Sequence, residues 1–458
     1  MKSKRSQLNH AARLAEKRFG ICEHQLLIGD LSIQELTKKF GTPLFIYHRE
    51  TITNTIRDLQ SRLPDRFQLY YSIKANPNAA ILRTVLAEGC GLEIASCGEL
   101  QQALAAGCHP EQILFAGPGK TTAELTAALE AGIGEIHVES IEEARWINQL
   151  AGEKRSVESI SLRVNPVDTA GGAMQMGGKP SPFGIDEESL ESVVAEIKQQ
   201  DNTKITGIHL YMGTQILDAE ILIAQYHRGI SIANAVAEQI ESPLATLDFG
   251  GGLGTPYFAH ETELDLDAFQ QGLIGIDEAM ASSPWLADTK AIIEPGRFLV
   301  NEAGVYVSRV TRVKHSRGKI YAVIDGGMHH HLAASGNLGQ TIKRNYPLAI
   351  LNKIDEPHSA DLVEIIGPLC TPLDTLGRSI SLPPIEAGDL VGVFQSGAYA
   401  RAASPLGFLS HPTPAEVIVS DKDAHLIRRR GLAKDLLEDQ QLYSTETNST
   451  ETDSTDTD

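Results

Sequence analysis

Apolar residues recur along the middle of the chain in two alternating patterns. Short runs of aliphatic, aromatic and β-branched residues alternate with segments whose apolar residues are three or four positions apart, as on one face of a helix. The strand-like runs lie at 67–73, 91–95, 112–116, 135–139, 159–164, 204–211, 244–249 and 290–293. Eight such strand–helix units predict a closed (β/α)8 barrel, an α/β fold.

The pattern changes after Ala303, where alternating β runs follow one another with few helices between them. These runs lie at 304–313, 320–324, 361–366 and 389–394, and two similar short runs precede the barrel at 25–28 and 44–47. We therefore predict an N-terminal extension (1–25), a segment partly joining the β domain (26–66), the barrel (67–302), a C-terminal all-β domain (303–435) and an acidic tail (436–458). The tail from Ser444 carries five acidic and no basic residues, which predicts disorder.

Composition excludes several classes of protein. Of the 458 residues 42% are hydrophobic and 22% are charged, which is ordinary for a globular protein. A formal charge of −19 argues against nucleic acid or an anionic membrane as the main partner. No apolar run of signal-peptide or membrane-spanning length occurs, and the five scattered cysteines suit reduced thiols, so we expect a cytoplasmic protein.

Barrel enzymes carry their chemistry at the C-terminal ends of the strands. The first predicted strand delivers Lys74 to such an end, where Asn76-Pro77-Asn78 stops the strand and opens a helix. Gly250-Gly251-Gly252 follows another apolar strand, and bare backbone N–H groups there can approach a phosphate. A lysine amine near a phosphate cradle is what an enzyme needs to hold pyridoxal 5'-phosphate. Other polar residues at strand ends are 93–96, Arg163, Asn165, His209, Tyr211 and 294–297.

Candidate residues can also have a purely structural role in place of a catalytic or binding one. The cysteine at position 370, Cys370, could be a small buried hydrophobic residue, and Arg297 could be a salt-bridge partner at a strand end. The run His329-His330-His331 looks like a metal cluster, but consecutive side chains point in different directions. Structural or substrate-loop histidines are the better interpretation, and we predict no metal site.

Seven motifs together resemble the pyridoxal-phosphate decarboxylases of the diaminopimelate/ornithine type. They lie at 71–76 (Tyr-Ser-Ile-Lys-Ala-Asn), 98–100, 183–185, 248–252, 294–297 (Glu-Pro-Gly-Arg), 367–370 and 397–399. The resemblance covers about residues 26 to 417. It implies an alanine-racemase-like barrel, a β domain, and a homodimer whose active sites lie between subunits.

The resemblance also implies roles for individual residues. Lys74 would be the Schiff-base lysine, Glu294 would lie against the pyridine nitrogen, and Cys370 of the partner subunit would deliver a proton to the substrate carbon. A carboxylate at the pyridine nitrogen keeps it protonated, so that the ring accepts electrons fully. The cofactor's phosphate would be held by Gly250, Gly251, Gly252 and Tyr399, with Gly296 and Arg297; Arg163 would support its polar edge, and His209 its ring face.

Some positions depart from the usual pattern of that family. Tyr211 stands where a histidine usually stacks on the cofactor, and Glu93 stands where aspartate is common. The arginine–proline segment that grips a far carboxylate in diaminopimelate decarboxylases is not evident, and residues 325–337 stand in its place. With 176–180 and 370–374, that segment resembles a sub-branch associated with exosortase gene clusters and with decarboxylation of a glutamyl group on an acyl carrier protein.

We therefore expect a homodimeric, pyridoxal-phosphate-dependent carboxy-lyase acting on an amino acid. The substrate is either a carrier-linked or modified amino acid or meso-diaminopimelate, with Asp374, Arg297, Arg344 and Tyr346 as candidate substrate-binding residues. An amino-acid racemase on the same fold is disfavoured, because such racemases place an arginine, not Glu294, at the pyridine nitrogen. A non-catalytic cofactor-binding protein is disfavoured by the β domain that carries Cys370 and Tyr399.

Overall fold

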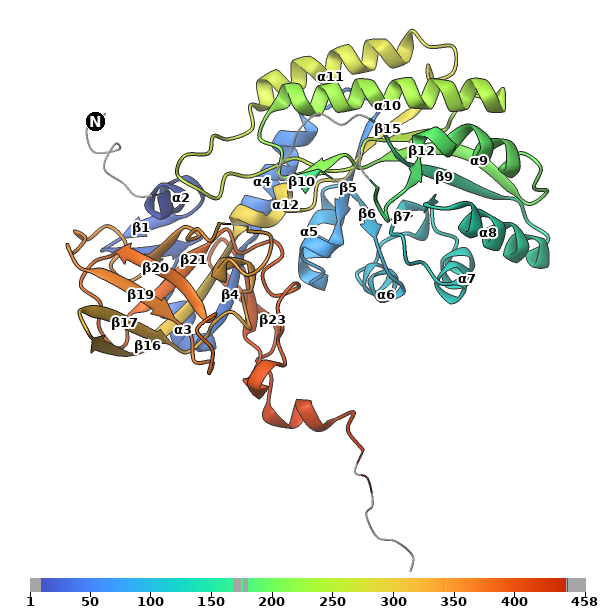
Figure 1. Ribbon diagram of the computed structural model, residues 1–458. Helices are drawn as coiled ribbons and strands as arrows, with labels where there is room; N and C mark the ends of the chain where they lie inside the picture. The colour runs from blue at the N-terminus through green and yellow to red at the C-terminus, as the bar shows by residue number, and fades with distance from the viewer. Residues whose placement is uncertain (1–9, 168–173, 176–179, 341, 442, 444–458) are drawn as a thin grey trace, which may run out of the picture.

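The computed structural model describes residues 10–167, 174–175, 180–340, 342–441 and 443. The segment 176–179 and the acidic end of the chain from Ser444, both of which entered the predictions, lie outside these residues. Two bodies make up the described chain: a parallel barrel and a β domain at its side (Figure 1).

Eight parallel strands close the barrel, as predicted. In spatial order they pair β5-β6-β7-β8-β9-β12-β14-β15, and β15 pairs back with β5. The strands are β5 (Phe67–Ser72), β6 (Gly91–Ile94), β7 (Ile113–Phe115), β8 (Glu135–Val138), β9 (Glu158–Asn165), β12 (Thr203–Leu210), β14 (Thr246–Asp248) and β15 (Lys290–Ile293). Their C-terminal ends therefore meet at one mouth.

Helices pack around the outside of the barrel. They are α4 (Arg49–Gln60), α5 (Ala79–Ala87), α6 (Cys97–Ala105), α7 (Thr122–Ala131), α8 (Ile141–Lys154), α9 (Leu190–Ile197), α10 (Ala219–Ile240) and α11 (Leu266–Ala281), with the short α12 (Arg297–Val300) after β15. Capping residues fix where the early helices begin: Asn78, Ser96, Thr121 and Ser140 each accept a hydrogen bond from a backbone N–H of the first turn. The long helices α10 and α11 lie side by side (Figure 1).

The β domain is built mainly after the barrel. Its strands are β16 (Gly304–Ser316), β17 (Lys319–Ile324), β18 (Leu348–Ile350), β19 (Leu362–Ile366), β20 (Thr375–Ser381), β21 (Leu390–Phe394), β22 (Ala415–Ser420) and β23 (Asp423–Arg428). From the N-terminal segment, β4 (Leu44–His48) inserts between β16 and β22, so residues before the barrel complete this sheet. The segment also forms α2 (His10–Arg18), α3 (Ile33–Phe40) and a small sheet of β1 (Gly20–Cys22), β2 (Gln25–Ile28) and β3 (Leu31–Ser32).

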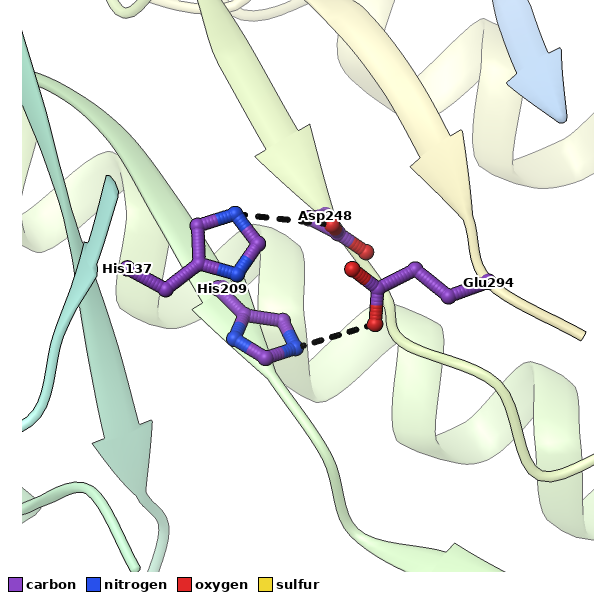
Figure 2. Close-up of side chains that lie close together, drawn as sticks. All are labelled: His137, His209, Asp248 and Glu294. Carbon is purple, nitrogen blue, oxygen red and sulfur yellow. Dashed lines mark ion pairs between the residues drawn. The ribbon is translucent and has the colours of Figure 1, made fainter. Parts of the chain in front are cut away.

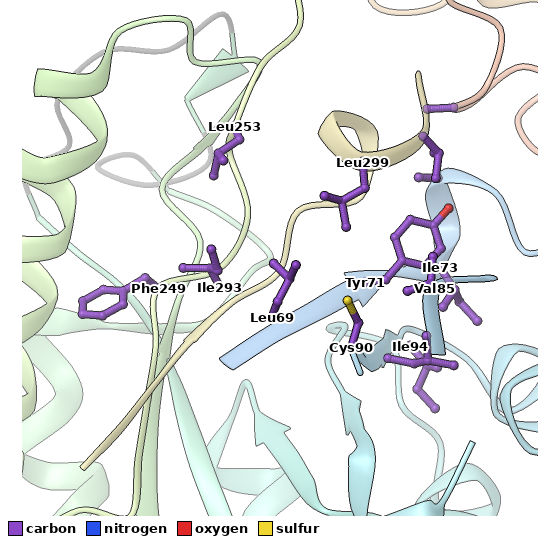
Figure 3. Close-up of a cluster of buried hydrophobic side chains, with 14 of the residues drawn as sticks. Leu69, Tyr71, Ile73, Val85, Cys90, Ile94, Phe249, Leu253, Ile293 and Leu299 are labelled. Carbon is purple, nitrogen blue, oxygen red and sulfur yellow. The ribbon is translucent and has the colours of Figure 1, made fainter. Parts of the chain in front are cut away.

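One apolar core runs from the barrel to the β domain and fixes the strand that precedes Lys74. Tyr71 and Ile73 are fully buried, and they lie in the same cluster as Cys90, Ile94 and Leu299 (Figure 3). Burial of such side chains stabilises a fold by about 1.5–3 kcal/mol each. Among the described residues no helix combines the length and apolar character needed to cross a membrane.

Candidate active site

Lys74 lies at the mouth of the barrel on a short 3-10 turn, Ile73–Ala75, that follows β5. The turn is held from the β domain: Tyr399 N–H donates to the Ala75 carbonyl (2.8 Å), and Asn76 Nδ2 donates to the Gly397 carbonyl (3.0 Å). The flanking residues Ile73 and Ala75 are buried, whereas 41% of the Lys74 side chain is exposed. The amine is therefore held at a fixed place and remains accessible to a small molecule.

The Lys74 ammonium is paired with a buried carboxylate. Its Nζ lies 2.7 Å from Oε2 of Glu93, which is 2% exposed and also accepts from the Ser72 hydroxyl. Burial lowers the pKa of Lys74, but the charges of Glu93, Tyr399, Glu294 and Tyr211 outweigh it and raise that pKa above the usual value. Lys74 is thus held as an ammonium until its proton is removed.

The predicted glycine turn follows β14 and leaves no room for side chains. A Cβ on Gly250, whose φ is +70°, would lie 2.4 Å from the Leu210 carbonyl oxygen, and one on Gly251 would lie 2.7 Å from the Glu294 carbonyl oxygen. Gly252 also has a positive φ, of +96°. These positions require glycine for conformation or space, and the bare backbone is what close approach of a phosphate requires.

Glu294 comes directly after β15 and is 4% exposed. Its Oε2 lies 3.4 Å from His209 Nε2, and its Oε1 has no hydrogen-bond partner among the described residues. Figure 2 shows it in one buried group with His209, Asp248 and His137. Burial lowers the pKa of His209 well below its usual value, and His137 and Arg163 lower it further, so His209 is neutral.

Arg297 and Tyr399 form a second polar cluster beside the lysine turn. The Arg297 guanidinium lies 4.6 Å from the centre of the Tyr399 ring, and its Nη1 donates to the Tyr257 hydroxyl (2.5 Å). Burial raises the pKa of Tyr399, which stays a neutral phenol able to donate a hydrogen bond. Gly296 packs so closely that a Cβ there would lie 2.9 Å from the Ser72 carbonyl oxygen.

Arg163, expected to support the cofactor's edge, is engaged by the protein itself. Its Nη1 donates to Glu139 Oε1 (2.5 Å), and its guanidinium lies 5.8 Å from the centre of the Tyr211 ring. A Cβ on Gly250 would approach the Tyr211 ring to 3.0 Å, so this ring lies against the glycine turn. His209, two residues earlier, instead packs against His137 with the ring centres 4.1 Å apart and the rings tilted by 33°. Tyr211 is thus the aromatic residue beside the predicted phosphate cradle.

The residues expected from the β domain divide into two groups. Tyr346 is buried against Tyr257, with ring centres 4.7 Å apart, and so adjoins Arg297. Arg344 is exposed, and its Nη1 lies 2.9 Å from His260 Nε2.

Cys370 is exposed as a free thiol. The carboxylate of Asp374 is buried and accepts from Met328 N–H (2.7 Å) and Leu369 N–H (2.9 Å), so within one subunit it ties two loops together.

Sequence reasoning did not assign three residues that the structure brings to the site: Glu93, His137 and Asp248. Glu93 and Asp248 were visible as acidic residues at strand ends, and His137 as a polar residue inside an apolar strand. None of these signals identifies a partner, because the partners lie on other strands. Lys74 meets Glu93 across β5 and β6, and His137 meets Asp248 across the barrel interior.

These residues fit pyridoxal phosphate. Lys74 offers an amine, the glycine turn offers backbone that a Cβ would obstruct, and Glu294 offers a buried carboxylate with an unpartnered oxygen. Arg297 and Tyr399 add a cation and a phenol beside the lysine turn. A parallel barrel with this set at its mouth, completed by a β domain, defines the class of barrel enzymes that use pyridoxal phosphate.

Comparison with known proteins agrees with that class and narrows it. Residues 49–301 match the family described as "Pyridoxal-dependent decarboxylase, pyridoxal binding domain". The chain belongs to this family: it is a pyridoxal-phosphate-dependent amino-acid decarboxylase, a carboxy-lyase.

Three relatives show how far the similarity extends. The L-glutamyl-[BtrI acyl-carrier protein] decarboxylase of Niallia circulans is 39% identical over 420 residues, which covers 91% of this chain and 97% of that protein. The diaminopimelate decarboxylase of Zymomonas mobilis is 31% identical over 431 residues, covering 92% and 98%. The structure of diaminopimelate decarboxylase from M. jannaschii with L-lysine superposes with a TM-score of 0.85 at 26% identity, covering 94% and 99%. The decarboxylase resemblance and the barrel-plus-β-domain fold are confirmed.

Proposed function

We propose that this decarboxylase removes the α-carboxylate of an amino acid whose far end is extended, as in a glutamyl group carried on an acyl-carrier protein. The similarity to the L-glutamyl-[BtrI acyl-carrier protein] decarboxylase over nearly the whole chain supports this substrate class. The observation that carries this proposal is which groups the two candidate substrate-binding arginines, Arg297 and Arg344, contact. Arg297 donates to Tyr257, packs on the Tyr399 ring and is assigned below to the cofactor's phosphate, and Arg344 is exposed, in contact with His260.

A free dicarboxylic substrate needs a fixed cation for its far carboxylate, since an isolated anion is costly to desolvate. A glutamyl group linked through its far end to a carrier has lost that charge and needs an open path instead. Arg297 already has other partners and Arg344 is exposed, so neither is a fixed cation for a far carboxylate. This arrangement suits a carrier-linked glutamyl group better than a free dicarboxylic substrate.

The residue roles belong to the same proposal. Lys74 would bind the cofactor covalently, Glu294 would face its pyridine nitrogen, and Gly250–Gly252 with Tyr399, Gly296 and Arg297 would hold its phosphate. When bound, pyridoxal phosphate supplies the electron sink for the bond to the departing carboxylate. Arg163 holds Tyr211 in place, and Arg163 and His209 support the cofactor site. Tyr346 and Arg344 line the path by which the substrate enters.

Cys370 and Asp374 enter the proposal through a homodimer. The Cys370 thiol is exposed within one subunit, as expected of a group that serves a neighbouring copy. In the dimer it delivers a proton to the substrate carbon of the partner's site. Asp374 accepts from Leu369 N–H and so fixes the loop that carries Cys370. In the proposed dimer its carboxyl group would face the substrate's amino group. We also propose a cytoplasmic location, which the five free cysteines support.

A carbon dioxide release assay tests the substrate. The cofactor-loaded protein is given an L-glutamyl acyl-carrier protein, free L-glutamate and meso-diaminopimelate, with Lys74→Ala as the inactive control. We expect release from the carrier-linked substrate at least tenfold faster than from either free amino acid. Equal or faster release from meso-diaminopimelate would reject the proposal and assign the chain to the second candidate.

That second candidate, meso-diaminopimelate decarboxylase, has its own support. The similarity to the diaminopimelate decarboxylase of Zymomonas mobilis and the superposition on the lysine-bound enzyme from M. jannaschii favour it. It requires Arg344 to turn into the site and bind the far carboxylate. Arg344→Ala would then raise KM for meso-diaminopimelate strongly, whereas a carrier-linked substrate would be little affected.

A further inference from the structure

Two carboxyl groups meet in the buried group below the cofactor site. Asp248 ends β14 and Glu294 follows the adjacent strand β15, and the two side chains are 0% and 4% exposed. Figure 2 shows their carboxyl groups beside each other, and an oxygen of each lies within 4.8 Å of an oxygen of the other. A hydrogen bond between two carboxyl groups requires a proton on one of them, because an ionised carboxylate only accepts.

The neighbouring donors do not replace that proton. Asp248 Oδ1 accepts from Gly250 N–H (2.8 Å), and the nearest imidazole, His137, lies 3.7 Å from Oδ2. His137 Nε2 is closer to Glu135 Oε1, at 3.1 Å, and a single N–H serves that contact. Neither Asp248 Oδ2 nor Glu294 Oε1 has a hydrogen-bond partner within the described parts of the chain. The two carboxyl groups must therefore hydrogen-bond to each other, with a proton on one of them.

The electrostatic surroundings favour one shared proton. Burial raises the pKa of Asp248 well above its usual range, and the Glu294 carboxylate raises it further. The imidazole in contact with Glu294, His209, is held neutral and offers no compensating charge. The other titratable groups facing the pair are Glu135 and His137 on β8, Tyr70 on β5, Tyr226 on α10, and the Lys74 ammonium, which feels the charge of Glu294 but is paired with Glu93. Burial raises the pKa of both tyrosines, which stay neutral.

We propose that Asp248 is a positioning residue that stays protonated and donates its proton to Glu294, so that the pair presents one negative charge to the cofactor ring. One negative charge balances one pyridinium. A doubly ionised pair would bury an uncompensated charge, and a doubly protonated pair would give the nitrogen no anion. This role rests on the proposed contact between Glu294 and the pyridine nitrogen.

Infrared spectroscopy tests the proton directly in the cofactor-free protein. We expect a carbonyl band of a buried carboxylic acid at neutral pH that disappears in Asp248→Asn. The matched control is Glu135→Gln, which removes a carboxyl group that already accepts from Thr246 and His137 and should keep the band. Absence of the band from the folded wild-type protein would overturn the proposal.

Cofactor binding supplies an independent readout. Asp248→Asn keeps a donor toward Glu294 and the same net charge, whereas Asp248→Ala removes the donor. We expect Asp248→Ala to weaken cofactor binding at least tenfold and to shift its visible absorption band, and Asp248→Asn to restore most of the affinity and the band position. Equal damage by both variants would show that Asp248 acts as an anion.

Two outcomes separate this inference from the proposed function. If the infrared band is present but Glu294→Gln leaves the bound cofactor's spectrum unchanged, the pair shares a proton and Glu294 does not face the pyridine nitrogen. If the band is absent while Glu294→Gln shifts the spectrum, the residue role stands and the shared proton is refuted. A stoichiometric divalent metal in the cofactor-free protein, lost in Asp248→Asn, would also refute it, because a cation would then join the two carboxylates.

Discussion

Lys74 Nζ and Glu93 Oε2 lie 2.7 Å apart across adjacent strands, and this contact holds the lysine charged. An amine must lose its proton before it can bond to the cofactor's aldehyde. Since burial lowers the pKa of Lys74 and Glu93 raises it above its usual value, removing the Glu93 charge should lower that pKa. In the wild-type protein, cofactor loading should accelerate about tenfold per pH unit through the neutral range.

Glu93→Gln should therefore load cofactor at least tenfold faster at neutral pH, with its pH profile moved to lower pH. The measurement is the rate at which the visible band appears after cofactor-free protein is mixed with pyridoxal phosphate. Ser72→Ala is the matched control, because it removes the other partner of Glu93 and keeps the carboxylate. Slower loading by Glu93→Gln across the whole range would contradict the assigned role of the pair.

Lys74→Ala should abolish the visible absorption band of the bound cofactor and all carbon dioxide release. The turn should stay folded, because its ties to Gly397 and Tyr399 are made by Asn76 and by backbone atoms. Circular dichroism and a melting curve check the fold, and absorption spectroscopy checks the cofactor. Lys319→Ala, on the exposed part of β17, is the control. A retained band would place the covalent link on another lysine.

Gly251→Ala should weaken cofactor binding by tenfold or more, because its Cβ would lie 2.7 Å from the Glu294 carbonyl oxygen and displace the cradle backbone. Equilibrium titration with pyridoxal phosphate measures the effect. Gly275→Ala, in α11, is the control: a Cβ there meets no atom within 4 Å, and the change should stabilise the helix by about 0.5–1 kcal/mol. Unchanged affinity in Gly251→Ala would move the phosphate site elsewhere.

Cys370→Ala should slow turnover by about 10²-fold or more without loss of bound cofactor, as expected when a proton donor is removed. If the active sites are shared between subunits, inactive Lys74→Ala and Cys370→Ala proteins should partly restore activity when mixed and allowed to exchange subunits. Cys22→Ala, at an exposed cysteine of β1, is the control. No restoration despite demonstrated exchange would place each site within one subunit.

His329, His330 and His331 should make the β domain less stable in acid. All three are buried, and burial lowers their pKa values to about 4, about 2 and about 3. Their contacts are structural: His330 Nδ1 lies 3.0 Å from the Tyr306 hydroxyl, and His331 Nε2 lies 3.0 Å from Ser396 Oγ.

The unfolded chain binds protons at these histidines near their ordinary pKa of 6.5, and the folded chain does not. Stability should therefore fall as pH falls from about 6.5 toward about 4, by about 1.4 kcal/mol per pH unit for each histidine. His329→Phe should remove one histidine's contribution to the change in unfolding free energy with pH. Phenylalanine can replace His329 without breaking a hydrogen bond, because neither ring nitrogen of His329 has a hydrogen-bond partner among the described residues. Denaturant unfolding at several pH values measures it, with exposed His315→Asn as the control; an unchanged slope in His329→Phe would contradict it.

The sequence by itself determined the barrel and the position of Lys74, the lysine proposed to bind the cofactor. Strand-like runs separated by helical patterns suffice for this, because the period of apolar residues reflects local backbone geometry. Apolar residues up to Ile73 and the stop at Asn76-Pro77-Asn78 put Lys74 at a strand end, and the run of glycines from Gly250 to Gly252 predicted a phosphate cradle. The motifs around these positions supplied the family and its cofactor.

Only the tertiary structure decided which side chains meet. Lys74 forms an ion pair with Glu93, and Asp248 lies beside Glu294. Arg163 forms an ion pair with Glu139, and the Asp374 carboxylate accepts from backbone amides of its own subunit. Most of these pairings join residues 19 to 46 positions apart on different strands or loops, and the contact of Asp374 with Leu369 joins residues five positions apart in one loop. Strand order and register set them, and the charge each group carries then follows from burial and from its neighbours, neither of which is encoded in a local run of residues.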